Sequence, residues 1–307
     1  MRSFKTIFLI LFFSCSKLFS VIILIHGTFS LKENWYQPNG KFFQELQKQA
    51  TILNKKIVPF CWTGENNNTA RIDAAKNLIQ LILSYPETEE IILIGHSHGG
   101  NIINIASKLL HNLKTTALTC DSENIFSSQE LANLINSSYE RIYGQKLNLQ
   151  TLVNIECLLN TKKEKSLNSK PTIKTNQKEF LIDQVYLLAT PVNKENLPDM
   201  SIIKNLYNFY SNGDLIQKVF GFYKRKISLN TRVTNLEIKF TNNQSTLNAE
   251  QKPGHSELHD PIIAQWLLKI PDKLKIEKIG GFENFNPEQD GIIYLSENFI
   301  KYEKSKS

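Results

Sequence analysis

The first third of the chain alternates between continuous apolar runs and stretches in which apolar residues recur every three or four positions. Continuous runs of β-branched and other apolar residues are typical of strands that are buried on both faces of a sheet. Apolar residues at helical spacing predict amphipathic helices that cover such a sheet. The expected strands lie at 21–25, 57–62 and 91–94, and the expected helices lie at 40–54, at 69–84 and after Ser97. This order predicts parallel strands joined by right-handed crossovers.

The strand pattern returns in the second half of the chain. Asp260 followed by Pro261 is a typical helix start, and apolar residues at helical spacing follow it. Further buried strands are expected at 183–189, 206–210 and 233–240, and we expect the last of these to be the final core strand. We therefore predict an α/β fold with a doubly wound, mostly parallel sheet.

The segment between these halves, 114–178, contains no strand of the buried type, but two amphipathic segments and a polar loop rich in Lys, Asn and Ser. Long stretches of this kind inside a compact domain are usually functional or disordered. We predict a helical cap or lid at 113–179 that covers the active edge of the sheet, the alternative being an excursion without a role. The core then comprises 21–112 and 180–270, followed by a C-terminal extension, 271–307, with no assigned role.

The stretch Gly95-His-Ser97-His-Gly99 ends the third predicted strand and begins a helix. A serine at such a sharp turn has a strained backbone, and a Cβ on either flanking glycine would collide with the strand or the helix. The turn lifts the serine hydroxyl above the sheet. The N–H of His98 lies at a helix N-terminus, where it can bind an oxyanion. Ser97 is therefore the expected nucleophile.

A serine nucleophile needs a base to take its proton and an acid to hold that base in one tautomer. In turns of this type the order along the chain is serine, acid and histidine. Asp214 satisfies this order, because it directly follows an apolar strand and a glycine turn. The alternative role for Asp214 is that of an ordinary turn aspartate. Asp183 and Asp199 are then the other candidate acids.

The expected base lies between the final core strand and the final helix, where the chain offers His255 and His259. His259 stands one residue ahead of the helix start at Asp260-Pro261, which largely dictates its direction. His255 follows Pro253-Gly254, a tight turn that can swing the imidazole over the serine. We favour His255 as the base and keep His259 as the alternative.

These motifs give the chain a resemblance to a known superfamily. From His26-Gly-Thr-Phe through the serine turn to Asp214 and His255, the chain resembles the α/β-hydrolases, specifically their lipase- and esterase-like bacterial members. The resemblance covers about 21–268. The two opening antiparallel strands of the family have no room before Val21, and this departure resembles the minimal secreted lipases.

The resemblance implies that Ser97, Asp214 and His255 form a catalytic triad, and that the N–H groups of Thr28 and His98 form the oxyanion hole. It implies a serine hydrolase that cleaves carboxylic esters of lipids or other acyl groups, makes transient contact with a lipid surface and needs no cofactor. Two alternatives stay open. One is a hydrolase-fold binding or scaffold protein without turnover, and the other is a thioesterase or acyltransferase that uses the same triad.

Composition and charge argue against other classes. Part of the formal net charge of +7 comes from lysines mixed with Asn, Ser and Thr in 162–178, which is typical of a solvated loop. We therefore expect no nucleic-acid partner. The four cysteines show no zinc-like spacing. His26, His96 and His98 have no carboxylate or cysteine cluster beside them, so no metal site is expected.

Residues 1–20 have the features of a secretory signal peptide. Arg2 and Lys5 precede an apolar core at 7–13, and small residues follow it. The core is too short for a comfortable membrane span. We predict a secreted or periplasmic protein, with a lipoprotein anchored at Cys15 or an uncleaved anchor as the alternatives.

Overall fold

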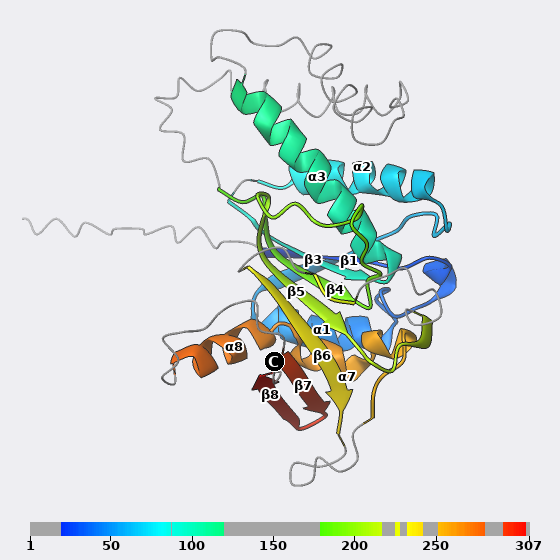
Figure 1. The fold of residues 1–307 in the computed structure, drawn as a ribbon, viewed down its shortest axis with the longest axis vertical. Coiled ribbons are helices and arrows are strands. Elements are labelled where there is room, and N and C mark those ends of the chain that lie inside the picture. The colour runs from blue at the N-terminus through cyan, green and yellow to red at the C-terminus, as the bar shows by residue number, and fades with distance from the viewer. Residues whose placement is uncertain are drawn as a thin grey trace, which may run out of the picture.

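A computed structural model of the chain describes the sheet and the helices that cover it (Figure 1). The described residues are 20–86, 88–119, 179–216, 225–227, 232–241, 251–279 and 291–304. The strands are β1 (Ser20–Ile25), β2 (Lys55–Phe60), β3 (Glu90–His96), β4 (Ile182–Leu188), β5 (Ile203–Tyr210), β6 (Val233–Phe240), β7 (Gly291–Ser296) and β8 (Phe299–Lys304). The helices are η1 (Ser30–Lys32), α1 (Lys41–Ile52), α2 (Asn68–Ser84), α3 (His98–Thr119), η2 (Ser256–His259), α7 (Pro261–Leu267) and α8 (Ile270–Ile279).

The eight described strands form one sheet in the order β2-β1-β3-β4-β5-β6-β7-β8. Every neighbouring pair is parallel except β7 and β8, which are antiparallel. All residues of β1 are buried, as expected of a continuous apolar run with helices on both sides. The predicted α/β character and the mostly parallel sheet are confirmed.

Two hydrophobic cores lie on opposite faces of the sheet (Figure 1). One contains side chains of α2 and α3, such as Leu78 and Ile102. The other contains side chains of α1, α7 and α8, such as Leu46, Ile263 and Ile270. Because the strands from β2 to β7 are parallel, their carboxyl ends meet at one edge, where the following loops are placed to build a ligand site.

The C-terminal residues extend the sheet beyond the strand that we expected to be the last. That expectation for Val233–Phe240 is wrong, because β7 pairs in parallel with β6, and β8 pairs with β7. The apolar run in β7 is short, so its pattern gave only a weak signal. Its Ile293 is nevertheless 1% exposed and belongs to the core on the α7 and α8 face. The C-terminal extension therefore contributes α8 and two strands to the fold.

Two predicted segments lie largely outside the described residues. Of the predicted cap at 113–179, residues 120–178 lie outside the described ranges. Its first residues, 113–119, form the end of α3. The predicted leader lies outside them except for Ser20, the first residue of β1. In the part of the chain that is described, no helix has both the length and the apolar character needed to cross a membrane.

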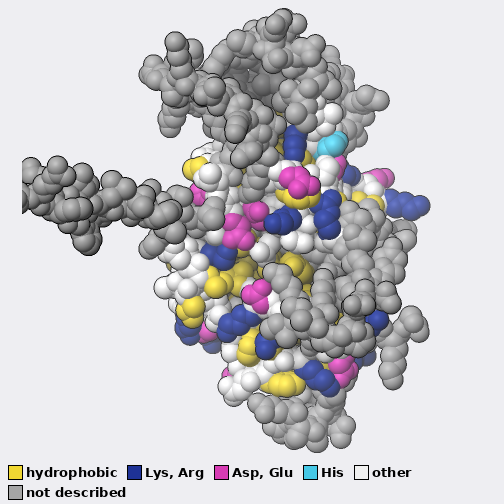
Figure 2. Space-filling view, turned by 90° about the vertical axis from the view of Figure 1, so that its left-hand side faces the viewer, with side chains coloured by type: hydrophobic (Ala, Val, Ile, Leu, Met, Phe, Trp, Pro, Cys, Tyr) yellow, Lys and Arg dark blue, Asp and Glu magenta, His cyan; other side chains and the backbone are white. Residues whose placement is uncertain are grey.

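On the face drawn in Figure 2, acidic and basic side chains of described residues are interspersed.

We predict that Ile293→Ala lowers the free energy of unfolding by about 2–5 kcal/mol, because it leaves a cavity in a packed core. Ile300→Ala in β8 is the matched control. The Ile300 side chain is only partly buried, so its truncation should cost clearly less. Urea unfolding of both variants measures the difference, and equal small losses would contradict the placement of β7 in the core.

Candidate active site

Ser97 occupies the sharp turn between β3, which ends at His96, and α3, which begins at His98. Its φ angle of 53° lies in the left-handed region that non-glycine residues rarely adopt. The Ser97 N–H donates to the Leu188 carbonyl (2.8 Å), and the Ser97 carbonyl accepts from the Gly100 N–H (3.0 Å). These bonds hold the strained turn, which places the hydroxyl at the carboxyl edge of the sheet.

The glycines on both sides of Ser97 let three elements approach closely. A Cβ on Gly95 would lie 2.7 Å from the backbone nitrogen of Gly100 in α3. A Cβ on Gly99 would lie 2.4 Å from the carbonyl oxygen of Ile25 in β1. The predicted collisions with a helix and a strand are therefore confirmed.

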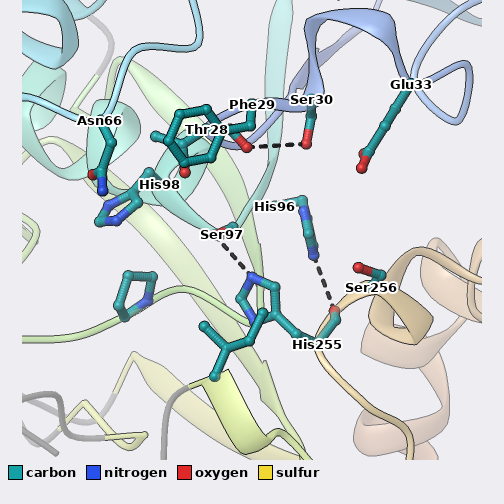
Figure 3. A pocket seen from close by; sticks show the side chains of 12 residues that line it. Thr28, Phe29, Ser30, Glu33, Asn66, His96, Ser97, His98, His255 and Ser256 are labelled. Atoms are coloured by element: carbon teal, nitrogen blue, oxygen red, sulfur yellow. Dashed lines mark hydrogen bonds between the residues drawn. The ribbon is translucent and has the colours of Figure 1, made fainter. Parts of the chain in front are cut away.

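The His255 imidazole bridges Ser97 and Asp214. Its Nε2 lies 2.9 Å from Ser97 Oγ (Figure 3), and its Nδ1 lies 2.8 Å from Asp214 Oδ2. A carboxylate only accepts hydrogen bonds, so the network assigns the proton to Nδ1 and leaves Nε2 to accept the serine O–H. This geometry is suited to passing the serine proton to the imidazole.

Asp214 and the segment that carries His255 are packed against each other. Asp214 follows β5 and is completely buried, whereas the His255 side chain is 12% exposed. A Cβ on Gly213 would lie 2.4 Å from the Lys252 carbonyl oxygen. The turn after β5 therefore contacts the backbone that leads to His255, and this contact fixes the acid relative to the imidazole.

The other candidate acids and the alternative base make different contacts. His259 stacks on Trp35, with ring centroids 5.0 Å apart. His255, by contrast, bridges the serine and the buried acid. Asp183 accepts a hydrogen bond from the Ile91 N–H (2.9 Å) in β3. Asp199 accepts one from the backbone N–H two residues further on (2.9 Å). Of these candidates, His255 is the one that contacts Ser97, and Asp214 is the acid that contacts His255.

Two candidate backbone donors belong to residues that line the cavity at the serine. Thr28 and His98 line the same cavity as Ser97, and a Cβ on Gly27 would lie 2.9 Å from Ser97 Cβ. Among the described residues, neither the Thr28 nor the His98 backbone N–H donates a hydrogen bond within the chain. His98 is also the first residue of α3, where the helix dipole favours negative charge. Both N–H groups are therefore available to an oxyanion.

His26 shapes the loop after β1. Its ring is buried and stacks on Tyr36 and Trp62, with centroids 4.6 and 5.6 Å away. Its Nδ1 donates to the Gly27 carbonyl (2.8 Å), and Trp62 Nε1 donates to the His26 carbonyl (2.8 Å). Burial lowers the pKa of His26, so the ring is neutral at pH 7.

Nowhere in the described ranges do three His, Cys, Asp or Glu side chains come together in a way that would hold a metal ion.

His96 belongs to the site, although no catalytic or positioning role was predicted for it from the sequence. Its Nε2 donates to the His255 carbonyl oxygen (3.1 Å), which ties the end of β3 to the loop that carries the imidazole (Figure 3). Burial, followed by the neighbouring His259 and His255, holds the pKa of His96 well below its usual range. His96 is therefore a neutral hydrogen-bond donor. The only sequence signal for it was its position next to the serine.

His98 presents a second neutral imidazole. Its Nδ1 accepts a hydrogen bond from Asn101 Nδ2 (2.9 Å). Burial, and then the nearby Arg71 and His255, lower the pKa of His98 to about 4. The ring lines the cavity, so it offers hydrogen bonding without charge at pH 7.

A cavity of about 350 Å³ opens at Ser97. Figure 3 shows Asn66 and His98 on one side of the serine, and Glu33 and Ser256 on the other. No sequence motif marks Glu33, so its place in the cavity could not be predicted from the sequence. The apolar part of the wall comes from Phe29, Pro191 and Ile216.

No known protein-family model matches the chain, and no curated protein matches it. The site itself consists of a strained serine, an imidazole, a buried carboxylate and two backbone donors around one cavity.

We predict that the His98 imidazole titrates in NMR with a midpoint near pH 4. The folded pKa then lies below the ordinary value of 6.5, so the unfolded chain binds more protons between these pH values. The free energy of unfolding should therefore fall as the pH is lowered from 6.5 toward 4, and His98→Gln should make the fall smaller. A midpoint near 6.5 would contradict the buried environment described for this ring.

Proposed function

We propose that the protein is a serine hydrolase that cleaves carboxylic esters and that its fold is of the α/β-hydrolase type. The observation that carries the proposal is the continuous contact from Ser97 Oγ through His255 to Asp214, at 2.9 and 2.8 Å. A hydroxyl, an imidazole and a buried carboxylate in this order form the arrangement that activates a serine nucleophile.

The placement of these groups in the sheet supports the same class. Ser97 follows β3, which lies inside the sheet, whereas Asp214 follows β5 and His255 follows β6. The strands are parallel, so all three residues come from loops at the same edge. The chain order of serine, acid and histidine is the order used by α/β-hydrolases.

The proposed reaction begins with attack by Ser97 Oγ on the ester carbonyl carbon while His255 Nε2 takes the serine proton. The carbonyl oxygen becomes an oxyanion, which accepts hydrogen bonds from the backbone N–H groups of Thr28 and His98. Asp214 keeps the proton on His255 Nδ1 and stabilises the imidazolium that forms. His96 holds the His255 backbone in place through its carbonyl.

Collapse of this intermediate breaks the bond to the leaving oxygen, which receives the proton from His255 Nε2, and the alcohol departs. The acyl group then remains on Ser97 Oγ. A water molecule gives its proton to His255 and attacks the acyl carbon, and a second oxyanion forms in the same position. Release of the carboxylic acid returns the proton to Ser97.

Two alternatives use the same residues differently. A thioesterase or acyltransferase would share the acyl-enzyme and differ in the leaving group or in the acceptor. A binding or scaffold protein would have no use for the left-handed backbone at Ser97, a conformation that costs about 1–3 kcal/mol and is typically retained at functional sites.

The leader pattern at 1–20 further leads us to propose that the protein is exported.

We predict that Ser97→Ala lowers ester hydrolysis by about 10⁶-fold, because the nucleophile is lost while the fold remains. A panel of p-nitrophenyl esters of rising chain length provides the assay and also reveals the preferred acyl group. Circular dichroism of the variant checks that it is folded. A folded Ser97→Ala protein that kept a tenth of the activity would place the chemistry elsewhere.

We further predict that His255→Ala loses several orders of magnitude in kcat, whereas His259→Ala loses about tenfold or less. The reason is that His255 contacts both Ser97 and Asp214, while His259 stacks on Trp35. The two variants are matched alanine replacements, assayed on one ester. The reverse ranking would move the base to His259.

A further inference from the structure

The cavity at Ser97 has an uneven distribution of charge. Glu33 is the one carboxylate among the described residues that line it, and these residues include no lysine or arginine. His96 and His98 also line it, and burial keeps both of their imidazoles neutral at pH 7. Glu33 therefore adds a negative charge to the described wall itself, whereas the Asp214 carboxylate lies buried behind His255.

Glu33 is held by the loop that follows β1. Glu33 caps the C-terminal end of η1, where its backbone N–H donates to the Ser30 carbonyl (3.0 Å). The hydroxyl of the buried Tyr36 donates to the Leu31 carbonyl (3.3 Å), which anchors the same turn. The Glu33 side chain is 45% exposed. Its backbone is thus fixed, while its carboxylate remains accessible to a ligand in the cavity.

No cation of the described residues neutralises Glu33. The ionisable group that approaches it is His259, whose Nε2 lies 3.9 Å from Glu33 Oε2, too far for a hydrogen bond. Desolvation lowers the pKa of His259, so this ring is neutral at pH 7. The carboxylate is therefore available to a positive group on a substrate.

The position of Glu33 indicates which part of a substrate it meets. The base gives its proton to the leaving oxygen, so the alcohol portion of an ester lies on the His255 side of the cavity. Figure 3 shows Glu33 on the same side of Ser97 as Ser256, the residue after His255, and shows His98 on the opposite side. Glu33 therefore lies on the side of Ser97 where the leaving group is expected.

We propose that the substrate is an ester whose alcohol portion carries a positive charge, such as a quaternary ammonium or amino alcohol, and that Glu33 is the residue that selects it. This inference rests on the proposed ester hydrolysis. The uncharged wall formed by Phe29, Pro191 and Ile216 is left for the acyl portion. Attraction between a half-exposed carboxylate and a nearby cation is modest and weakens with salt, and both properties can be measured.

The test compares butyrylcholine with its uncharged carbon analogue, 3,3-dimethylbutyl butyrate, and follows acid release by pH-stat titration. We expect kcat/KM to be about tenfold higher for the charged ester at low ionic strength, and the ratio to fall as salt is added. Glu33→Gln should bring the ratio close to unity. The matched control is Glu45→Gln in α1, whose carboxylate pairs with Lys48 away from the cavity and which should leave the ratio unchanged.

Equal hydrolysis of the two esters, abolished by Ser97→Ala, would overturn the inference and leave the proposed function intact. A charge preference that Glu33→Gln does not reduce would also overturn it, because another group would then be responsible. Hydrolysis of neither ester, together with no effect of Ser97→Ala on any p-nitrophenyl ester, would overturn both the inference and the proposed function.

Discussion

The left-handed backbone at Ser97 is the constraint on which the rest of the site depends. A φ of 53° at a serine is unfavourable, and it persists because β1, β3 and α3 meet at glycines where no Cβ fits. The same turn aims the serine side chain at His255, and among the described residues no acceptor pairs with the His98 N–H. The packing of the sheet therefore determines the direction of one hydroxyl and one backbone donor together.

Burial controls the charge of the histidines around this turn. His26, His96, His98 and His259 all have pKa values lowered mainly by desolvation, so at pH 7 they act as neutral hydrogen-bonding or stacking groups. His96 uses this neutrality to donate to the His255 carbonyl. Two of these uncharged rings, His96 and His98, line the cavity at the serine, and Glu33 is the carboxylate among the described residues that line it.

The features that could be predicted from sequence are those encoded by neighbouring residues. The continuous apolar strands, the glycines around Ser97 and the order of Ser97, Asp214 and His255 are local patterns, and the structure brings these three residues together. β7 was missed because its apolar run is short and becomes buried only by pairing with β6. The hydrogen bond from His96 to His255 and the placement of Glu33 were missed because tertiary packing brings together segments distant in sequence.

The central claim is that Ser97 is chemically activated by His255, and labelling with a fluorophosphonate tests it most directly. The probe reacts covalently with activated serines and requires no knowledge of the substrate. The account predicts that peptide mass spectrometry finds the label on Ser97, and that His255→Ala slows labelling strongly in a protein that remains folded. Absence of label from Ser97, or labelling at an unchanged rate in His255→Ala, would contradict it.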